Sequence, residues 1–248
     1  MLSAPLDASI INAALGQYWR VIVIELTEST QSDLITLVRT GTAAAGDVRV
    51  ADYQSKGRGR LMRSFDALQG TALLFSFYIQ PKRILEDWGY IPLIVGTSLA
   101  QTLSDFDAKL KWPNDVLINE KKVAGIIAEA TDDGIVIGVG INVGMQVHQL
   151  PVPTATSLLI EGARNMSRNQ LLVGFLNNFE KKFLAWDGGS DEITADYLKL
   201  SATIGRKVRV EYPHGESENG LAVSISHRGE LVLASGRRVQ AGDIVHLR

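Results

Sequence analysis

The chain has 248 residues, of which 46% are hydrophobic and 21% are charged, and it contains no cysteine. This composition excludes a disordered or fibrous protein, and the absence of cysteine excludes disulfides, thiolate nucleophiles and cysteine metal sites. With 25 basic against 27 acidic residues the net charge is −2. The molecule as a whole therefore has no excess of positive charge that would attract nucleic acid or an anionic membrane.

The first half of the chain alternates strand and helix patterns. Runs of β-branched and apolar residues predict strands at 20–26, 47–53 and 71–79. Thr30, with Asp33 three positions later, resembles a capping box that opens a helix ending at Gly41. A second helix is predicted over 91–106 from its length and apolar spacing.

The second half begins with short strands and ends with shorter ones. Residue types typical of turns stand at Asn119-Glu120 and at 132–134, between short strand-like runs. This alternation predicts an antiparallel meander. These runs lie at 109–112, 115–119, 122–130 and 134–143. A helix predicted over 167–187 carries apolar residues at helical spacing and should pack on the sheet. About 45 residues of short strands then predict a small β-barrel beyond residue 202.

A basic loop joins the strands predicted at 47–53 and 71–79. Its glycines let the backbone approach a ligand closely, and its arginines can fork onto carboxylate or phosphate oxygens. Its cations are Lys56, Arg58, Arg60 and Arg63. A solvated turn is the alternative interpretation of this loop taken alone, because short basic runs are common by chance.

The segment KWPNDV, residues 111–116, is a second candidate site. Proline holds the preceding residue extended, so Asn114 and Asp115 lie at a rigid corner. Lys111 and Asp115 supply a cation for phosphates and a hard oxygen ligand for Mg²⁺. The alternative is an ordinary Asx turn.

Lys122 begins the otherwise apolar strand within KKVAGIIAEA (121–130), with Gly125 close by, so its amino group can lie over an aliphatic pocket. A solvated strand end is the alternative. GVGINVG, residues 138–144, fails as a dinucleotide fingerprint because Val143 replaces a required glycine outside any βαβ unit. The sequence also lacks a phosphate loop and a serine nucleophile elbow, and its four histidines have no metal-ligand spacing.

Several of these segments together resemble the biotin protein ligases in order and near spacing. They are ESTQSDL (28–34), YQSKGRGR (53–60), KWPNDV (111–116), KKVAGIIAE (121–129) and GVGINV (138–143). The resemblance runs from about Trp19 to Trp186. It implies an α+β fold, with a mixed or antiparallel central sheet and packed helices, of the class II synthetase-like biotin/lipoate ligase type. It implies a catalytic domain over 1–201 and a small SH3-like β-barrel domain over 202–248.

The resemblance also implies a reaction and its residues. Biotin is activated with ATP and Mg²⁺ as biotinyl-5′-AMP and is then passed to a lysine of a biotin carboxyl carrier domain of a carboxylase. Catalytic roles are implied for Lys122, Arg58 and Arg60. Biotin contacts are implied for Ser29, Thr30, Gln31, Gln54, Arg58, Gly59, Arg60, Lys122, Gly125, Gly138 and Gly140. ATP contacts are implied for Arg60, Arg63, Lys111, Asn114, Asp115 and Asn142, with Asp115 as the metal ligand.

Cations are needed because the biotin carboxylate must approach the α-phosphate of ATP. Like charges at ~4 Å cost about 4 kcal/mol at an effective dielectric of 20. The loop departs from the family pattern, which often continues with further glycine or arginine and a tryptophan, whereas Leu61, Met62 and Phe65 stand here. Loop closure can therefore differ in tightness, and Phe65 can still stack over the ligand.

Further expectations concern partners. About 18 residues precede the expected catalytic domain, too few for the DNA-binding domain of regulatory members, so we expect no repressor activity. Without a secretion signal or an apolar run of ~18 residues, we expect a cytoplasmic protein that binds no membrane. A lipoate or octanoate ligase or transferase is the nearest alternative, and a nucleic-acid binding module is the alternative from another class. The protein is expected to be a monomer or a homodimer.

Overall fold

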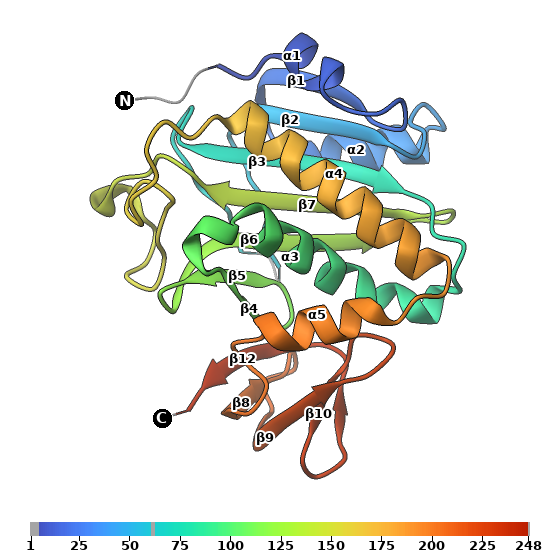
Figure 1. Cartoon of the computed structure of the whole chain (residues 1–248), viewed down its shortest axis with the longest axis vertical. Coiled ribbons are helices and arrows are strands. Elements are labelled where there is room, and N and C mark those ends of the chain that lie inside the picture. Colours follow the sequence, from blue (N-terminus) through green and yellow to red (C-terminus); the bar gives the residue numbers. More distant parts are fainter. Residues whose placement is uncertain (1–4, 61–62, 248) are drawn as a thin grey trace. The chain divides into compact units, whose positions relative to one another are not determined.

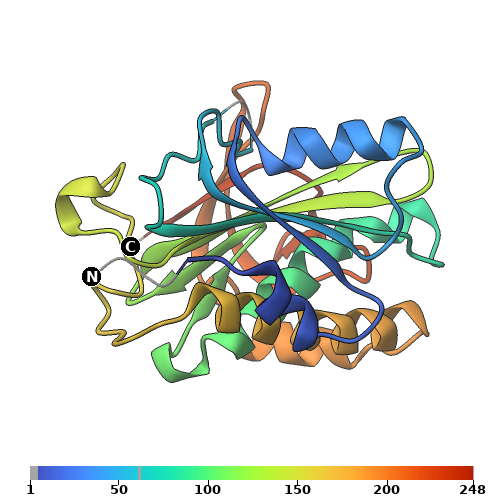
Figure 2. The same ribbon diagram turned by 90° about the horizontal axis from the view of Figure 1, so that it is seen from above.

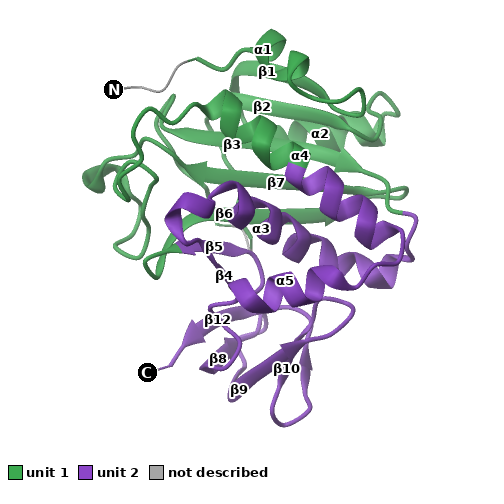
Figure 3. Cartoon of the chain, viewed as in Figure 1, with its two compact units in different colours: residues 1–81, 118–177 green, residues 82–117, 178–248 purple. Residues whose placement is uncertain are grey.

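The computed structural model describes residues 5–60 and 63–247, and its chain forms two compact units (Figure 3). The first unit comprises Met1–Pro81 and Ile118–Asn177, and the second comprises Lys82–Leu117 and Asn178–Arg248. Both units are thus assembled from separate stretches of sequence. The domain boundary expected near residue 202 stays a prediction.

The first unit is built on a mixed β-sheet (Figure 1). Its strands are hydrogen-bonded in the order β1-β2-β3-β7-β6, with β1 parallel to β2 and the remaining neighbours antiparallel. The elements are α1 (Ala8–Ala13), β1 (Arg20–Thr27), α2 (Thr30–Arg39), β2 (Asp47–Gln54), β3 (Ala72–Ile79), β6 (Lys121–Ala130) and β7 (Ile135–Asn142). Helix α4 (Arg168–Asp187) begins in this unit, and a short 3-10 turn covers Val147–Gln149.

Strand β3 is buried at every position because both faces of the sheet are covered. Phe75 and Phe77 pack edge-on against Phe175 at the start of α4. On the opposite face Tyr78 packs against Leu34 and its neighbours in α2. Figure 2 shows α2 and the beginning of α4 on opposite sides of the sheet. The expected packing of the 167–187 helix on the sheet is confirmed.

The start of α2 differs from the predicted capping box. Ser29, not Thr30, is the N-cap, and its side chain accepts from the backbone N–H of Ser32. Thr30 is instead turned inward, where its hydroxyl contacts Gln54 and Ser76, and Asp33 accepts from Thr27. The hydroxyl expected to cap the helix is therefore used for long-range contacts.

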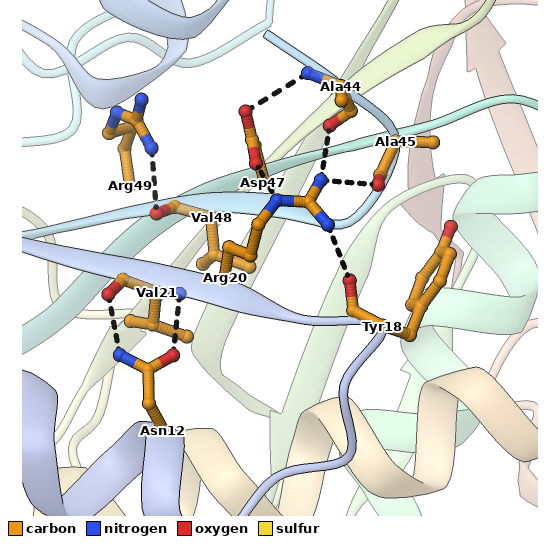
Figure 4. A network of polar contacts seen from close by, with 9 residues as sticks. All are labelled: Asn12, Tyr18, Arg20, Val21, Ala44, Ala45, Asp47, Val48 and Arg49. Atoms are coloured by element: carbon orange, nitrogen blue, oxygen red, sulfur yellow. Dashed lines mark hydrogen bonds and ion pairs between the residues drawn. The ribbon is translucent and has the colours of Figure 1, made fainter.

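Arg20 ties the start of β1 to the turn that precedes β2 (Figure 4). Its guanidinium donates to the carbonyl oxygens of Tyr18, Ala44 and Ala45 and pairs with Asp47 at 2.6 Å. One side chain thus satisfies several carbonyls at a parallel strand pair.

We expect Arg20→Ala to lower the free energy of unfolding by about 1 to 3 kcal/mol, the scale of hydrogen bonds made by a charged group. Urea denaturation would measure the change. Arg49→Ala is the matched control, because among residues 5–60 and 63–247 Arg49 donates a single long bond, to Val48 at 3.4 Å. Equal effects from both variants would contradict the importance of the Arg20 contacts.

The second unit contains helices, a hairpin and the C-terminal strands. Its elements are α3 (Ile91–Thr102), β4 (Lys109–Lys111), β5 (Asp115–Ile118, whose last residue belongs to the first unit), the later part of α4, α5 (Glu192–Leu200), β8 (Lys207–Glu211), β9 (Ser217–Ile225), β10 (Leu231–Leu233), β11 (Arg238–Val239) and β12 (Asp243–His246), with 3-10 turns at Leu85–Tyr90 and Ser104–Phe106. The helix predicted over 91–106 ends earlier, at Thr102, before the second 3-10 turn.

The C-terminal strands form a separate antiparallel sheet in the order β11-β10-β9-β8-β12. Val208 and Val210 of β8 and Ile244 of β12 are buried, as alternation of apolar residues in short strands requires. The predicted small β segment after residue 202 is confirmed. Within residues 5–60 and 63–247, none of the helices combines the length and the apolar character needed to cross a membrane.

Candidate active site

The basic loop folds back on itself. Gly57 and Phe65 are joined by a backbone hydrogen bond of 2.9 Å, and Gly59 donates to the carbonyl of Arg63 at 2.7 Å. A Cβ atom on Gly57 would collide with the carbonyl oxygen of Phe65. The glycines therefore let the two arms of the loop approach each other, a requirement that comes before any contact with a ligand. Leu61 and Met62 lie outside the described residues.

Two cations of the loop hold it to neighbouring segments. Arg58 pairs with Glu129 of β6 at 3.0 Å, and Lys56 pairs with Glu28 before α2 at 2.7 Å. The backbone N–H of Arg63 donates to the carbonyl of Arg60 at 3.1 Å. Both ion pairs are partly or largely exposed, so each contributes little stability and can exchange its partner for a ligand anion.

The predicted polar cluster lies at the entry of α2. Thr30 donates from its backbone N–H and its hydroxyl to the side-chain oxygen of Gln54, at 2.7 and 2.9 Å. Ser29, Thr30 and Gln31 are each only 2% exposed. Since buried polar groups are costly without partners, this cluster is the kind of preorganised surface that recognises a polar ring.

Three glycines of β6 and β7, which we name the glycine track, lie beside this cluster. They are Gly125, Gly138 and Gly140. Gly125 and Gly140 are directly paired across the strands. A Cβ on Gly138 would lie 2.8 Å from Oε1 of Gln31, and one on Gly140 would lie 2.7 Å from the ring of Phe65. The missing side chains thus make room for α2 and the loop to reach the sheet.

Lys122 is fixed at both backbone groups. Its N–H donates to Thr154 and its carbonyl accepts from Thr156, each at 2.8 Å. Its Nζ lies 3.0 Å from the position that a Cβ on Gly125 would occupy. The amine therefore lies beside Gly125, and the role expected of Lys122 stays a prediction.

We expect Gly125→Ala to slow the protein's reaction about 10-fold without lowering its stability. The new methyl group would shift the flexible end of Lys122 by a few tenths of an ångström, and misplacement of a reacting group costs rate steeply. Gly144→Ala is the control, because its methyl group meets nothing closer than 3.9 Å. Thermal unfolding and turnover would be measured together; unchanged turnover in Gly125→Ala would contradict a role for the Lys122 amine at this position.

The residues expected on the ATP side divide between the units. Asn142 belongs to the first unit, where it is 5% exposed and donates to the carbonyl of Thr156 at 2.9 Å. Lys111, Asn114 and Asp115 belong to the second unit. Lys111 and Asp115 are paired across the β4-β5 hairpin, so the tight turn brings this cation and this carboxylate together.

Trp112 anchors that turn within the second unit. It is 2% exposed, its backbone N–H donates to Thr203 at 3.1 Å, and its indole N–H donates to the carbonyl of Gly229 at 2.9 Å. The peptide bond to Pro113 is cis. A buried tryptophan whose backbone and indole N–H groups are both hydrogen-bonded explains why the KWPND segment is rigid as well as polar.

Among the described residues, no group of three or more histidine and acidic side chains could hold a metal ion by itself. A magnesium ion in phosphoryl-transfer sites is usually held by one or two carboxylates together with the phosphates of the substrate. Asp115 fits this donor set. The Mg²⁺ role of Asp115 stays a prediction.

Tyrosines with a shifted pKa have a structural explanation. Burial is the main reason that the pKa of Tyr197 is raised, and burial also raises the pKa of Tyr90, whose hydroxyl contacts Thr194 at 2.7 Å. Both residues belong to the core of the second unit. Neutral phenols in a packed core do not indicate a catalytic acid.

The sequence analysis missed Glu129, which contacts both Arg58 and Gln31. It also missed Ser76, which meets Thr30 at 2.9 Å. Both stand in apolar strands, so their signal in the sequence is a single polar residue facing the same side of the sheet as the glycine track.

Comparison with known proteins shows to which proteins the chain is similar. Residues 23–146 match the model of the biotin/lipoate A/B protein ligase family. A biotin–[acetyl-CoA-carboxylase] ligase of Mycobacterium tuberculosis is 35% identical over 100% of this chain and 98% of its own length. A bifunctional ligase/repressor of Bacillus subtilis is 29% identical over 93% of this chain and 74% of its own.

Solved structures show the same likeness. A biotin protein ligase of Aquifex aeolicus, in complex with biotin and ATP, superposes with a TM-score of 0.79 and 28% identity. The superposition covers 92% of this chain and 98% of that one. The predicted α+β fold with a C-terminal β-sheet is confirmed.

Proposed function

The chain belongs to the biotin/lipoate A/B protein ligase family, and within it to the biotin protein ligases, and from this premise we propose that it activates biotin with ATP and attaches it to a carboxylase. In the first step the biotin carboxylate attacks the α-phosphorus of ATP and pyrophosphate leaves, which gives biotinyl-5′-AMP. In the second step a lysine amine of the acceptor attacks the carbonyl carbon and AMP leaves.

The observation that carries the proposal is the position of the Lys122 amine beside Gly125, in the unit that also holds the buried polar cluster at the start of α2. A cation beside the reacting carboxylate and phosphate stabilises the charge that builds up on phosphorus. Ser29, Thr30, Gln31 and Gln54 would bind the ring system of biotin, and Gly125, Gly138 and Gly140 would be among its contacts. Arg58, Gly59 and Arg60 would line the adenylate.

ATP contacts are proposed for five cations and amides that the resemblance singles out. They are Arg60, Arg63, Lys111, Asn114 and Asn142. Asp115 would contribute a carboxylate oxygen to the Mg²⁺ that accompanies ATP, and the ion would neutralise phosphate charge. The solved structure of the Aquifex relative in complex with biotin and ATP supports these substrates.

The acceptor would be the biotin carboxyl carrier domain of a biotin-dependent carboxylase. The Mycobacterium relative is named as a biotin–[acetyl-CoA-carboxylase] ligase, which supports a carboxylase as the acceptor. That relative is named as a ligase alone, which supports a ligase without repressor activity. We further propose a cytoplasmic protein, a monomer or a homodimer, with the catalytic domain over 1–201 and the C-terminal domain over 202–248. It would bind neither nucleic acid nor a membrane, so its affinity for DNA at physiological salt would be negligible.

The test is to incubate the purified protein with MgATP and either biotin or lipoate, and to search for the acyl-adenylate and pyrophosphate by mass spectrometry. Biotinyl-adenylate alone is the expected product. Lipoyl-adenylate would keep the chemistry but change the substrate, because lipoate ligases belong to the same family. No adenylate with either acid would overturn the proposal.

A further inference from the structure

The segment 154–158 runs beside the start of β6 and the end of β7. The carbonyl of Thr154 accepts from the backbone N–H of Lys122, and the N–H of Thr156 donates to the carbonyl of Lys122, each at 2.8 Å. The carbonyl of Thr156 also accepts from Nδ2 of Asn142 at 2.9 Å. Thr156 therefore joins the backbone of Lys122 to the side chain of Asn142, two residues that are expected at the site.

The side chain of Thr156 is held as well. Thr156 is 1% exposed, and its hydroxyl donates to Oε1 of Glu161 at 2.5 Å. Glu161 lies half-buried in the turn that follows the segment, where its own N–H donates to the carbonyl of Ser157 at 3.0 Å. Hydrogen bonds to a carboxylate are shorter and stronger than bonds between neutral groups. The carboxylate of Glu161 is therefore a strong anchor for Thr156.

The second oxygen of the same carboxylate contacts the turn that leads into β6. Oε2 of Glu161 accepts from Nδ2 of Asn119 at 2.6 Å. Asn119 stands three residues before Lys122, is exposed and adopts a φ of 49°. Glu161 thus holds the chain before Lys122, through Asn119, and beside it, through Thr156. All of these residues belong to the first unit.

We propose that Glu161 is a positioning residue that fixes the backbone of Lys122, and with it the place of the amine, through Thr156 and Asn119. This inference rests on the proposed function, in which the amine stabilises charge at phosphorus. The stem of a lysine is flexible, so a fixed backbone is the first condition for a fixed amine. Misplacement of a reacting group by about 1 Å can cost about 100-fold in rate.

Two substitutions of Glu161 separate its hydrogen bonds from its charge. Glutamine at position 161 would accept from Thr156 with its oxygen, and its NH₂ group would donate to Oδ1 of Asn119 once that amide has turned over. Glu161→Gln therefore keeps both contacts without the charge, whereas Glu161→Ala removes both contacts. Glu25→Ala is the matched control, because it removes the same charge from an exposed position on β1 in the same unit.

The first experiment measures the single-turnover rate of biotinyl-adenylate formation from biotin and MgATP, with thermal unfolding as the check of folding. We expect Glu161→Ala to slow this step about 10-fold, the effect of a misplacement of well under 1 Å. Glu161→Gln and Glu25→Ala should stay within about threefold of the unchanged protein. The proposal is overturned by a normal rate in Glu161→Ala, or by a rate in Glu161→Gln as low as that of Glu161→Ala.

A second variant separates positioning from loss of stability. Asn119→Gly removes the amide that Glu161 holds, and glycine adopts the positive φ of this position more readily than asparagine does. The Tm should therefore not fall, while the rate of adenylate formation should fall about threefold. A purely structural role would not lower the rate of a protein that is equally stable. An unchanged rate in Asn119→Gly would overturn the proposal.

A double-mutant cycle with Lys122→Ala tests whether Glu161 acts through the amine. Residues that act as a unit have non-additive effects on rate, whereas independent residues have additive ones. In the Lys122→Ala protein, Glu161→Ala should slow the residual adenylate formation by less than about twofold, because no amine is left to position. The same loss of about 10-fold in both backgrounds would mean that Glu161 does not act through Lys122, and would overturn the proposal.

Hydrogen exchange tests the same contacts without any substrate. The backbone N–H groups of Lys122 and Thr156 should exchange about 10-fold faster in Glu161→Ala than in the unchanged protein, and equally fast in Glu25→Ala. Unchanged exchange in Glu161→Ala would overturn the inference. A protein that forms no biotinyl-adenylate would contradict the proposed function, and exchange would still decide on the contacts of Glu161. Normal adenylate formation together with unchanged exchange in Glu161→Ala would contradict only the role of Glu161.

Discussion

Replacing Lys122 by alanine is expected to abolish practical adenylate formation, with kcat reduced by at least about 10²- to 10³-fold. That is the effect of removing one fixed group that stabilises charge in a transition state. The side chain extends over Gly125, and its backbone is held by Thr154 and Thr156 through bonds that alanine keeps. The structural role of position 122 should therefore survive the substitution.

The measurement is single-turnover formation of biotinyl-adenylate from biotin and MgATP. Lys121→Ala is the control, because Lys121 is the exposed neighbour on the same strand and carries the same charge. Thermal unfolding of both variants should match that of the unchanged protein. Near-normal adenylate formation in Lys122→Ala would remove Lys122 from the mechanism.

The second large effect is expected on stability. Arg168 at the start of α4 has a side chain only 2% exposed and pairs with Asp52 of β2 at 2.7 Å. Its Nη1 also donates to the carbonyl of Ala72 at 3.3 Å. Removing the carboxylate would take the ion-pair partner at 2.7 Å away from a buried cation. We expect Asp52→Ala to lower the free energy of unfolding by about 3 to 5 kcal/mol.

Thermal unfolding followed by circular dichroism would check this, with an expected fall in Tm of roughly 6 to 20 °C. Glu28→Gln, which breaks a largely exposed pair, should change stability by less than about 1 kcal/mol. The double variant Asp52→Leu with Arg168→Met should recover much of the loss, because it leaves no buried charge. A double variant as unstable as Asp52→Ala would mean that packing, and not charge, is the cause.

Asp52 lies two residues before Gln54, so this ion pair also bears on the candidate site. Gln54 accepts from Thr30, and β2 leads directly into the basic loop. A disturbed β2 would move one side of the polar cluster. The stability assay should therefore be paired with a biotin-binding assay, so that loss of fold and loss of geometry are not confused.

The sequence by itself determined the identity of most elements. Strands β1, β2, β3, β6 and β7 and helices α2, α3 and α4 were predicted within a few residues of their observed ends, because period-2 and period-3.6 patterns are local. The turn at Asn119 and Glu120 was also predicted, because its signal lies in these two neighbouring residues. Both adopt positive φ, at 49° and 63°. The short helices α1 and α5 were not predicted, because six and nine residues give little periodic signal.

Only the tertiary structure decided which polar groups meet. Ser29 rather than Thr30 caps α2 because Thr30 is engaged by Gln54 and Ser76, and Ser76 lies 46 positions away. Glu129 and Gln31 are 98 positions apart, and their contact depends on strand register and on the absence of a side chain at Gly138.

Local propensity carries no information about such pairs, because a contact across a sheet is set by register and by the side on which each residue falls. The sequence therefore identified the loop, the glycines and Lys122 as candidates, and the fold alone added the carboxylate that holds two of the candidate residues together.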